Sequence, residues 1–260
     1  MDFVEHNREA WKREVEKENP WTRPVDRDVI QKARQGDWSV LLTPTKPVPK
    51  PWFPELEKIQ LLCLACGGGQ QAPVFATLGA DVTVFDNCPA QLEKDREVAE
   101  REGLTLALEQ GDMRDLSRFP DEWFSLIFHP TSNCFVDDIL AVWRESYRVL
   151  KQGGILLSGF CNPVTFIFDL KEWDDHKNLV VRYKIPYSDL QQLPKEELDA
   201  RINAKETLEF GHSLEDQIGG QIAAGFSIQG FYEDSSGGDL LDSYLNTFIA
   251  TKAIKGSPTS

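Results

Sequence analysis

The stretch QLLCLACGGGQQAPVFATLGADVTVFDNCPA, residues 60–90, decides the fold of this 260-residue chain. Its apolar run LLCLA (61–65) has the composition of a parallel strand that is buried on both faces. Three glycines (67–69) follow this run and lead into a helix, and DVTVF (81–85) is a second apolar run. The stretch therefore predicts a strand–helix–strand unit, which is the building block of a parallel sheet with helices on both faces.

The same alternation continues toward the C-terminus. It predicts an α/β fold with a doubly wound, seven-stranded, mostly parallel sheet, whose last two strands form an antiparallel edge. The elements expected beyond the first unit are a helix from Pro89 to about residue 102, strands at 104–110, 123–128 and 155–160, helices at 137–150 and 213–226, and a closing strand pair joined by the turn SSGGD.

Two segments depart from this alternation. Residues 1–55 carry four of the seven tryptophans and end in LLTPTKPVPKPWFP (41–54), whose prolines cannot sit inside a sheet. Residues 162–210 interrupt the pattern after the fifth strand. We therefore expect an N-terminal cap at 1–55 and a core at 56–260, with an insertion at 162–210 that acts as a lid.

The charge balance limits the partners of the chain. Its 28 basic and 42 acidic residues give a net charge of −14, which repels phosphate backbones and anionic headgroups. No apolar run approaches the roughly 20 residues of a membrane span, and the N-terminus lacks the apolar run of a signal peptide. Five scattered cysteines are typical of reduced thiols. We expect a soluble cytoplasmic protein that binds neither nucleic acid nor membranes.

The glycine turn is the first candidate binding site. Glycines lack a Cβ atom, so a ligand can approach the backbone and the free amides of the helix N-terminus. Gly67-x-Gly69-x-x-Ala72 fits the spacing of dinucleotide-binding turns, and Asp86 follows about 20 residues later, at the tip of the next strand. A carboxylate there can accept both ribose hydroxyls, although it could also cap the helix that begins at Pro89. These residues predict a nucleoside cofactor without identifying it.

A second carboxylate is expected at the same edge of the sheet, because Gly111-Asp112-Met113 ends the third strand. An aspartate of this kind is also common in turns. The run from residue 60 to 113, with RVLKQGGILLSGF (148–160) behind it, resembles the class I S-adenosylmethionine-dependent methyltransferases. It looks most like the bacterial group that acts on small molecules or on unassigned substrates.

The resemblance implies S-adenosylmethionine as the cofactor and S-adenosylhomocysteine as the product. Gly67 and Gly69 would cradle the methionine part of the cofactor, and Asp86 would hold the ribose. Asp112 and Met113 would hold the adenine. The residues that the resemblance places at the cofactor are Ala65, Cys66, Gly67, Gly69, Gln70, Asp86, Asn87, Asp112, Met113 and His129.

Two positions depart from the family pattern. Cys63 stands where an acidic residue is usual, and Ala65 stands where a glycine is usual. The backbone carbonyl of Ala65 would then be available to the amino group of the cofactor. Cys63-x-x-Cys66 has the spacing of a zinc or redox pair but lacks a second pair of ligands at a suitable distance, so we expect two buried thiols and no metal.

Histidine is scarce, and His129 follows the fourth strand directly in the loop FHPTSN. In class I methyltransferases the loop after that strand commonly faces the transferable methyl group. His129 and Asn133 are therefore expected to contact the substrate, and His129 could remove a proton from the acceptor. The alternative is a histidine that is hydrogen-bonded to the loop backbone. His212, in EFGHSLED, is expected to cap the helix that follows it.

These observations favour transfer of a methyl group to a small-molecule acceptor. A catalytically silent S-adenosylmethionine-binding module, which regulates or scaffolds a partner, is the alternative from a different class. Tyr147-x-x-x-Lys151 matches the Tyr/Lys pair of short-chain dehydrogenases. We reject that function because Lys151 lies at the end of its helix, where a cation stabilises the C-terminus. The sequence indicates neither the acceptor atom nor the oligomeric state.

Overall fold

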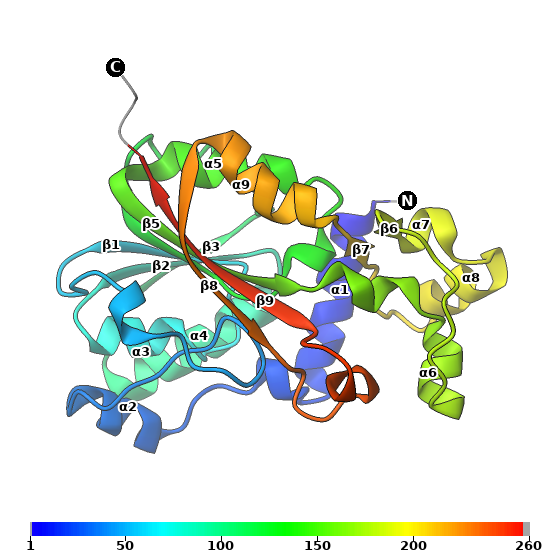
Figure 1. Cartoon of the computed structure of the whole chain (residues 1–260). Coiled ribbons are helices and arrows are strands. Elements are labelled where there is room, and N and C mark those ends of the chain that lie inside the picture. Colours follow the sequence, from blue (N-terminus) through cyan, green and yellow to red (C-terminus); the bar gives the residue numbers. More distant parts are fainter. Residues whose placement is uncertain (1, 257–260) are drawn as a thin grey trace.

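The computed structural model describes residues 2–256 and contains a central seven-stranded sheet (Figure 1). The order of the strands across the sheet is β3-β2-β1-β4-β5-β9-β8. This order reverses direction at β1, so the carboxyl ends of β1 and β4 border a crevice in which ligands bind in open α/β sheets. The strands are β1 (Gln60–Leu64), β2 (Asp81–Asp86), β3 (Leu106–Gln110), β4 (Phe124–His129), β5 (Leu150–Cys161), β8 (Phe226–Asp234) and β9 (Phe248–Lys255).

The sheet is parallel except at one side. β9 runs antiparallel to both of its neighbours, with Ile155 of β5 opposite Ile254 and Ser227 of β8 opposite the same residue. The predicted α/β fold with an antiparallel edge pair is confirmed. The antiparallel strand itself lies one position in from the edge, because β9 is inserted between β5 and β8.

Helices cover both faces of the sheet, as Figure 1 shows. α2 (Arg27–Arg34), α3 (Ala72–Thr77) and α4 (Pro89–Glu102) lie on one face, and α5 (Ile139–Val149) and α9 (Gly220–Ala224) lie on the other. Each face has its own buried cluster of side chains, one around Phe75 and Phe128 and one around Trp143 and Leu156. These two cores fix the position of every strand end that borders the crevice.

Two of the predicted elements differ in detail from the structure. β5 begins at Leu150, earlier than the expected residue 155, because Leu150 pairs with Phe124 ahead of an irregularity in the ladder. The helix expected at 213–226 is divided into a π-helical turn, η5 (Glu215–Gly219), and α9. Gly220 lies at this junction, where a Cβ atom would come within 2.6 Å of Leu140. Glycine therefore allows α9 to pack closely on α5.

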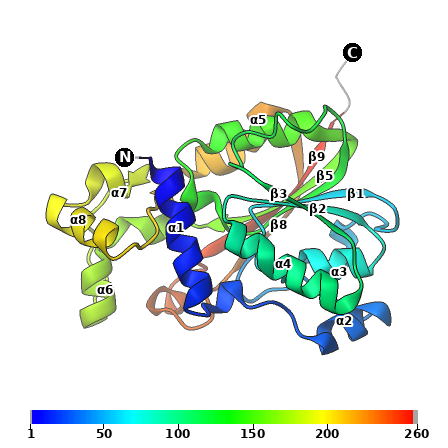
Figure 2. The same ribbon diagram turned by 180° about the vertical axis from the view of Figure 1, so that it is seen from behind.

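The N-terminal segment and the insertion meet at the carboxyl edge of the sheet. Figure 2 shows α1 (Phe3–Glu16) between α4 and the helices of the insertion.

Among residues 2–256, no helix has both the length and the apolar composition that a membrane span requires. The shorter elements of these regions and of the loops are η1 (Pro20–Thr22), η2 (Lys50–Trp52), η3 (Asn133–Phe135), η4 (Pro163–Ile167), α6 (Leu170–His176), β6 (Tyr187–Ser188), α7 (Asp189–Gln192), α8 (Lys195–Asn203), β7 (Phe210–Gly211) and η6 (Leu240–Ser243).

Candidate active site

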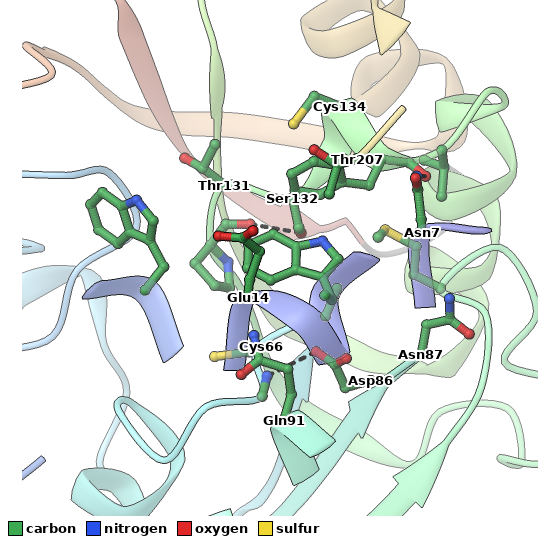
Figure 3. Close-up of a pocket in the computed structure, with 18 of the residues that line it drawn as sticks. Asn7, Glu14, Cys66, Asp86, Asn87, Gln91, Thr131, Ser132, Cys134 and Thr207 are labelled. Atoms are coloured by element: carbon green, nitrogen blue, oxygen red, sulfur yellow. Dashed lines mark hydrogen bonds between the residues drawn. The ribbon is translucent and has the colours of Figure 1, made fainter. Parts of the chain in front are cut away.

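A cavity of about 490 Å³ lies where the carboxyl ends of β1, β2 and β4 meet α1 (Figure 3). Two groups of residues contribute much of its lining. We call the stretches 65–70, 86–91 and 111–113, which lie at the carboxyl ends of β1, β2 and β3 and contribute lining residues, the core wall. We call α1 together with residues 207–209, which belong to the two appendages, the appendage wall.

Asp86, the last residue of β2, organises the core wall. Its Oδ2 accepts a hydrogen bond from the backbone amide of Gly67 at 2.9 Å, and its Oδ1 accepts one from the amide of Cys88 at 2.9 Å. Burial raises the pKa of the carboxyl group, whereas the two amide donors act in the opposite direction. Each carboxylate oxygen can accept more than one hydrogen bond. Asp86 therefore holds the turn in place and can still accept hydroxyl groups from a ligand.

The glycines of the turn are required by the close approach of α4. A Cβ atom on Gly67 would lie 2.7 Å from the Cβ of Gln91, and one on Gly69 would lie 2.6 Å from the carbonyl oxygen of Lys94. Gly69 also has a φ of +70°, which L side chains rarely adopt. Gly67 lines the cavity and Gly69 lies behind it, so Gly69 serves the packing of the turn.

Asp95 of α4 was not predicted from the sequence, although it holds the same turn. Its side chain is completely buried, and its Oδ2 accepts a hydrogen bond from the amide of Gly68 at 3.0 Å. Burial raises the pKa of this carboxyl group to about 8. The amides of Gly67 and Gly68 thus donate to carboxylates of the protein, which corrects the expectation that they are free for a ligand. The signal was available, because Asp95 shares the buried stripe of α4 with Leu92 and Ala99.

Ala65 adopts a backbone conformation that favours glycine, which is the residue that the resemblance leads us to expect at this position. It lies just after β1 with a φ of +47°, and its amide donates to the carbonyl oxygen of Phe85 at 2.7 Å. Ala65 and Cys66 both line the cavity. Cys63 is buried inside β1, and its hydrogen bond with the Cys66 thiol, together with burial, raises the pKa of Cys66 well above its usual value. The described residues contain no group of three or more His, Cys, Asp or Glu side chains arranged to hold a metal ion.

Asp112 and Met113 line the cavity at the end of β3. Asp112 forms an ion pair with Arg114, whose Nη2 lies 2.6 Å from Oδ2. The preceding Gly111 lies against the ring of Phe85, so closely that a Cβ atom would come within 2.2 Å of it. This contact brings the backbone of residues 111–113 close to Asp86. A flat group can lie there, between the carboxyl ends of β2 and β3.

Gln70 and Asn87 line the cavity and also attach the cap to the core. The Gln70 amide nitrogen donates to the carbonyl oxygens of Pro20 and Arg23, both at 3.0 Å. Asn87 donates to the carbonyl oxygen of Val4 at 2.9 Å. Both side chains were expected at the cofactor, and the structure shows that they position the N-terminal segment as well.

His129 does not occupy the position expected for it. It is the last residue of β4 and is completely buried, with Nδ1 2.9 Å from the carbonyl oxygen of Leu64 and Nε2 2.5 Å from Oδ1 of Asn133. Asn133 in turn donates to Oε1 of Gln217 at 2.9 Å. Burial lowers the pKa of the imidazole. Neither His129 nor Asn133 lines the cavity, because their polar atoms bind to other groups of the protein. The structure therefore does not place His129 or Asn133 at the acceptor, or His129 at the cofactor, as was expected.

The loop after β4 faces the cavity through other residues, namely Pro130, Thr131 and Ser132. His212 fixes the same loop from the other side, since its Nε2 lies 3.1 Å from the carbonyl oxygen of Asn133 and 2.9 Å from that of Val136. The expectation that His212 caps the following helix is therefore wrong.

Sequence reasoning predicted the two appendages but identified neither Asn7 nor Glu14 as residues that line the cavity. Val4, Asn7, Trp11 and Glu14 line the cavity from one face of α1, at helical spacing. Asn7 fastens this helix to the insertion, because its Oδ1 accepts from the amide of Leu208 at 2.8 Å and its Nδ2 donates to the carbonyl of the same residue at 3.0 Å. In Figure 3, Asn7 and Glu14 lie between Asp86 below and Thr207 and Cys134 above.

Residues 62–158, which carry the core wall, match a family model described as a methyltransferase domain. The chain is 53% identical over 253 residues to the methyltransferase YbaJ of Bacillus subtilis, a match that covers 97% of this chain and 98% of the relative. The chain belongs to the methyltransferase family.

Solved structures show which fold this methyltransferase has. S-adenosylmethionine-dependent methyltransferases of Listeria monocytogenes and Mesorhizobium loti superimpose with TM-scores of 0.63 and 0.60, at 18% and 16% identity. The matches cover 80% and 79% of this chain, and 95% and 94% of the other two. Together with the strand order described above, these superpositions show that this methyltransferase has the Rossmann-like fold of those two proteins.

The Tyr/Lys pair has no catalytic position in this methyltransferase. The ring of Tyr147 packs against Phe226 and lies 4.6 Å from Nζ of Lys255, and Lys151 reaches Ser125. Neither Tyr147 nor Lys151 lines the cavity. The methyltransferase family and this placement both exclude the dehydrogenase.

Proposed function

We propose that this methyltransferase binds S-adenosylmethionine on the core wall and transfers its methyl group to a small molecule that approaches from the appendage wall. One observation carries the proposal: the glycine turn and Asp86 share one cavity of about 490 Å³ with residues of both appendages. That volume lies within the range of about 300–1,000 Å³ that is typical of small-molecule sites.

The residues of the core wall suit the donors of the cofactor. The cofactor presents hydroxyl groups, an exocyclic amino group and an ammonium group, and Asp86 and Asp112 present carboxylate oxygens at the ends of neighbouring strands. Gln91 lines the same cavity beside Asp86 (Figure 3), and its buried Oε1 has no hydrogen-bond partner among the described residues. An unpaired buried acceptor is costly, so a ligand donor at this point would stabilise the bound state.

We assign the ribose to Asp86, the adenine to Asp112, Met113 and Asn87, and the methionine part to the backbone of residues 65–67. Gln70 completes this set by keeping the cap against the turn. When bound, S-adenosylmethionine supplies an activated methyl group on a sulfonium ion. The task of the protein is then to align the acceptor with that methyl group and to exclude water.

The acceptor is proposed to be small because α1 covers the cavity. The helix is attached to the core through Asn87 and to the insertion through Asn7, so a polymer would have to displace it. The net charge of −14 also disfavours nucleic acids. The aromatic rings of Trp11 and Phe135, which pack edge to face with centroids 5.2 Å apart, give part of the cavity an apolar surface.

Two measurements test this function. Isothermal titration should show binding of S-adenosylmethionine and S-adenosylhomocysteine to the purified protein, and NADH should not bind. Incubation of the protein with methyl-labelled cofactor and a metabolite panel should then transfer label to at least one small molecule. Binding without transfer to any acceptor would favour the catalytically silent module, and absence of binding would contradict the proposal.

A further inference from the structure

A second cavity of about 240 Å³ adjoins the first one. Three residues line both cavities, namely Cys161 at the end of β5, Glu209 before β7 and Phe248 at the start of β9. The rest of its lining comes from the insertion, including Phe166, Phe168, Trp173 and Tyr187, and from the loop between β8 and β9.

Aromatic rings form much of this second cavity. Phe166 and Tyr187 stack with centroids 5.8 Å apart and an interplanar angle of 24°, and Phe168 meets Trp173 edge to face at 5.7 Å. Faces and edges of rings at these separations suit another flat ring. The volume lies below the roughly 300 Å³ at which sites for drug-sized ligands begin, so a single substituted ring is the appropriate size.

Glu209 stands at the junction of the two cavities with a fixed backbone and a free carboxylate. Its amide donates to Oδ2 of Asp189 at 2.8 Å, and its carbonyl oxygen accepts from the amide of Asp189 at 3.1 Å. Its carboxylate makes no hydrogen bond to any group that the structure describes. The nearby cation, Arg201, instead pairs with Asp189 at 3.2 Å. The carboxylate is therefore available to a ligand.

The surroundings of Glu209 in the folded protein stabilise the protonated form of its carboxyl group, relative to the same group in water. Burial raises its pKa to about 7, with a further contribution from the charge of Asp189, while Arg201 acts in the opposite direction. A carboxylate with a pKa near the working pH is well suited to take a proton from a reacting group. Asp239 also lines the second cavity, and its Oδ1 is buried without a partner among the described residues, which provides a second acceptor for a donor on the ligand.

We propose that the second cavity binds a hydroxylated single-ring aromatic acceptor, and that Glu209 is the catalytic base that removes the proton from the hydroxyl group to be methylated. This inference rests on the proposed function. The acceptor oxygen forms a bond to the methyl carbon, the bond between that carbon and sulfur breaks, and its electron pair remains on sulfur. The hydroxyl proton passes to the Glu209 carboxylate and then to water. The products are a methyl ether and S-adenosylhomocysteine.

The test uses catechol and hydroquinone as acceptor probes and aniline as an amine probe, each with methyl-labelled cofactor. The wild type should methylate a hydroxyl probe, with a kcat that rises with pH through an apparent pKa near 7. Glu209→Gln keeps the shape of the side chain but cannot take the proton, and it should lower kcat by about 10²- to 10⁴-fold. Glu206→Gln, an exposed neighbour on the same segment, is the matched control and should leave kcat unchanged.

A titration of S-adenosylhomocysteine separates this inference from the proposed function. Glu209→Gln should bind it with wild-type affinity, and loss of binding by the wild type itself would overturn the function as a whole. If the wild type binds the cofactor but methylates neither hydroxyl probe, or only aniline, the acceptor class is wrong. If Glu209→Gln retains wild-type kcat, or the wild-type profile is flat around pH 7, Glu209 is not the base. The profile needs no variant, so a folding defect in Glu209→Gln would leave the inference testable.

Discussion

The two walls of the cavity are built in different ways. The core wall is made of residues close together in sequence, at the ends of adjacent parallel strands, and its contacts are backbone amides held by the buried carboxylates Asp86 and Asp95. The appendage wall joins α1 to residues more than 190 positions away through single side chains, such as Asn7 to Leu208. The first arrangement follows from the topology of the sheet, whereas the second depends on individual residues. A fold can therefore keep one cofactor while it changes acceptors.

The largest effect should come from breaking the core wall at Asp86. Asp86→Ala removes the acceptor proposed for the ribose and leaves the amides of Gly67 and Cys88 unpaired, each buried donor costing about 1–3 kcal/mol. Calorimetry should show that affinity for S-adenosylmethionine falls at least about tenfold. Asp81→Ala, at the opposite end of the same strand, is the control and should bind normally. Unchanged affinity in Asp86→Ala would mean that the core wall does not hold the ribose.

Breaking the appendage wall at Asn7 should affect a different parameter. Asn7→Ala leaves the buried amide and carbonyl of Leu208 without their partner, so denaturant titration should show a loss of about 1–3 kcal/mol in the free energy of unfolding. The KM for an acceptor should rise more than the Kd of the cofactor. The exposed Glu9→Ala on the same helix should change neither. An effect on the cofactor as large as that of Asp86→Ala would remove the distinction between the two walls.

The pH dependence of stability should report on the core wall through Asp95. Its pKa is near 4 in an unfolded chain and about 8 in the folded protein. The folded state therefore binds a proton that the unfolded state releases, and this contribution to stability is lost as pH rises from about 4 to about 8.

Asp95→Asn cannot lose a proton and can still accept the hydrogen bond from Gly68. Its melting temperature should fall less than that of the wild type between pH 5 and pH 8, and Asp115→Asn, at an exposed loop position, should follow the wild type. Parallel curves for Asp95→Asn and the wild type would show that Asp95 does not titrate in this range.

The smallest expected effect concerns the turn itself. Ala65 has a φ of +47°, a region that costs a residue with a Cβ atom about 1–2 kcal/mol. Ala65→Gly relieves this cost, but it also increases the conformational entropy of the unfolded chain, which lowers the stability of the folded protein by about 0.4–1 kcal/mol. The melting temperature should therefore rise slightly, whereas Ala141→Gly in the first turn of α5 should lower it. A lower melting temperature for Ala65→Gly would indicate that the Ala65 methyl group contributes packing that outweighs the strain.

The difference between the walls also explains what could be predicted from the sequence. The strands, the glycine turn, Asp86 and Asp112 were predicted, because buried parallel strands are apolar runs and their carboxyl ends share one edge. His129 was misplaced because its position at the end of β4 is visible in the sequence but the direction of its side chain is not. Glu209 was not predicted, since its position beside the cavity depends on how the insertion folds back onto α1.

A crystal structure of the wild type with S-adenosylhomocysteine tests the central claim most directly. The claim is that the core wall holds the cofactor and directs its sulfur toward the appendage wall. The ribose hydroxyls should lie within hydrogen-bond distance of the Asp86 carboxylate, and the sulfur should face the side of the cavity that contains Glu209. The claim would be contradicted if the ribose lay away from Asp86. It would also be contradicted if the sulfur pointed toward the glycine turn and the adenine, instead of the sulfur, lay nearer to Glu209.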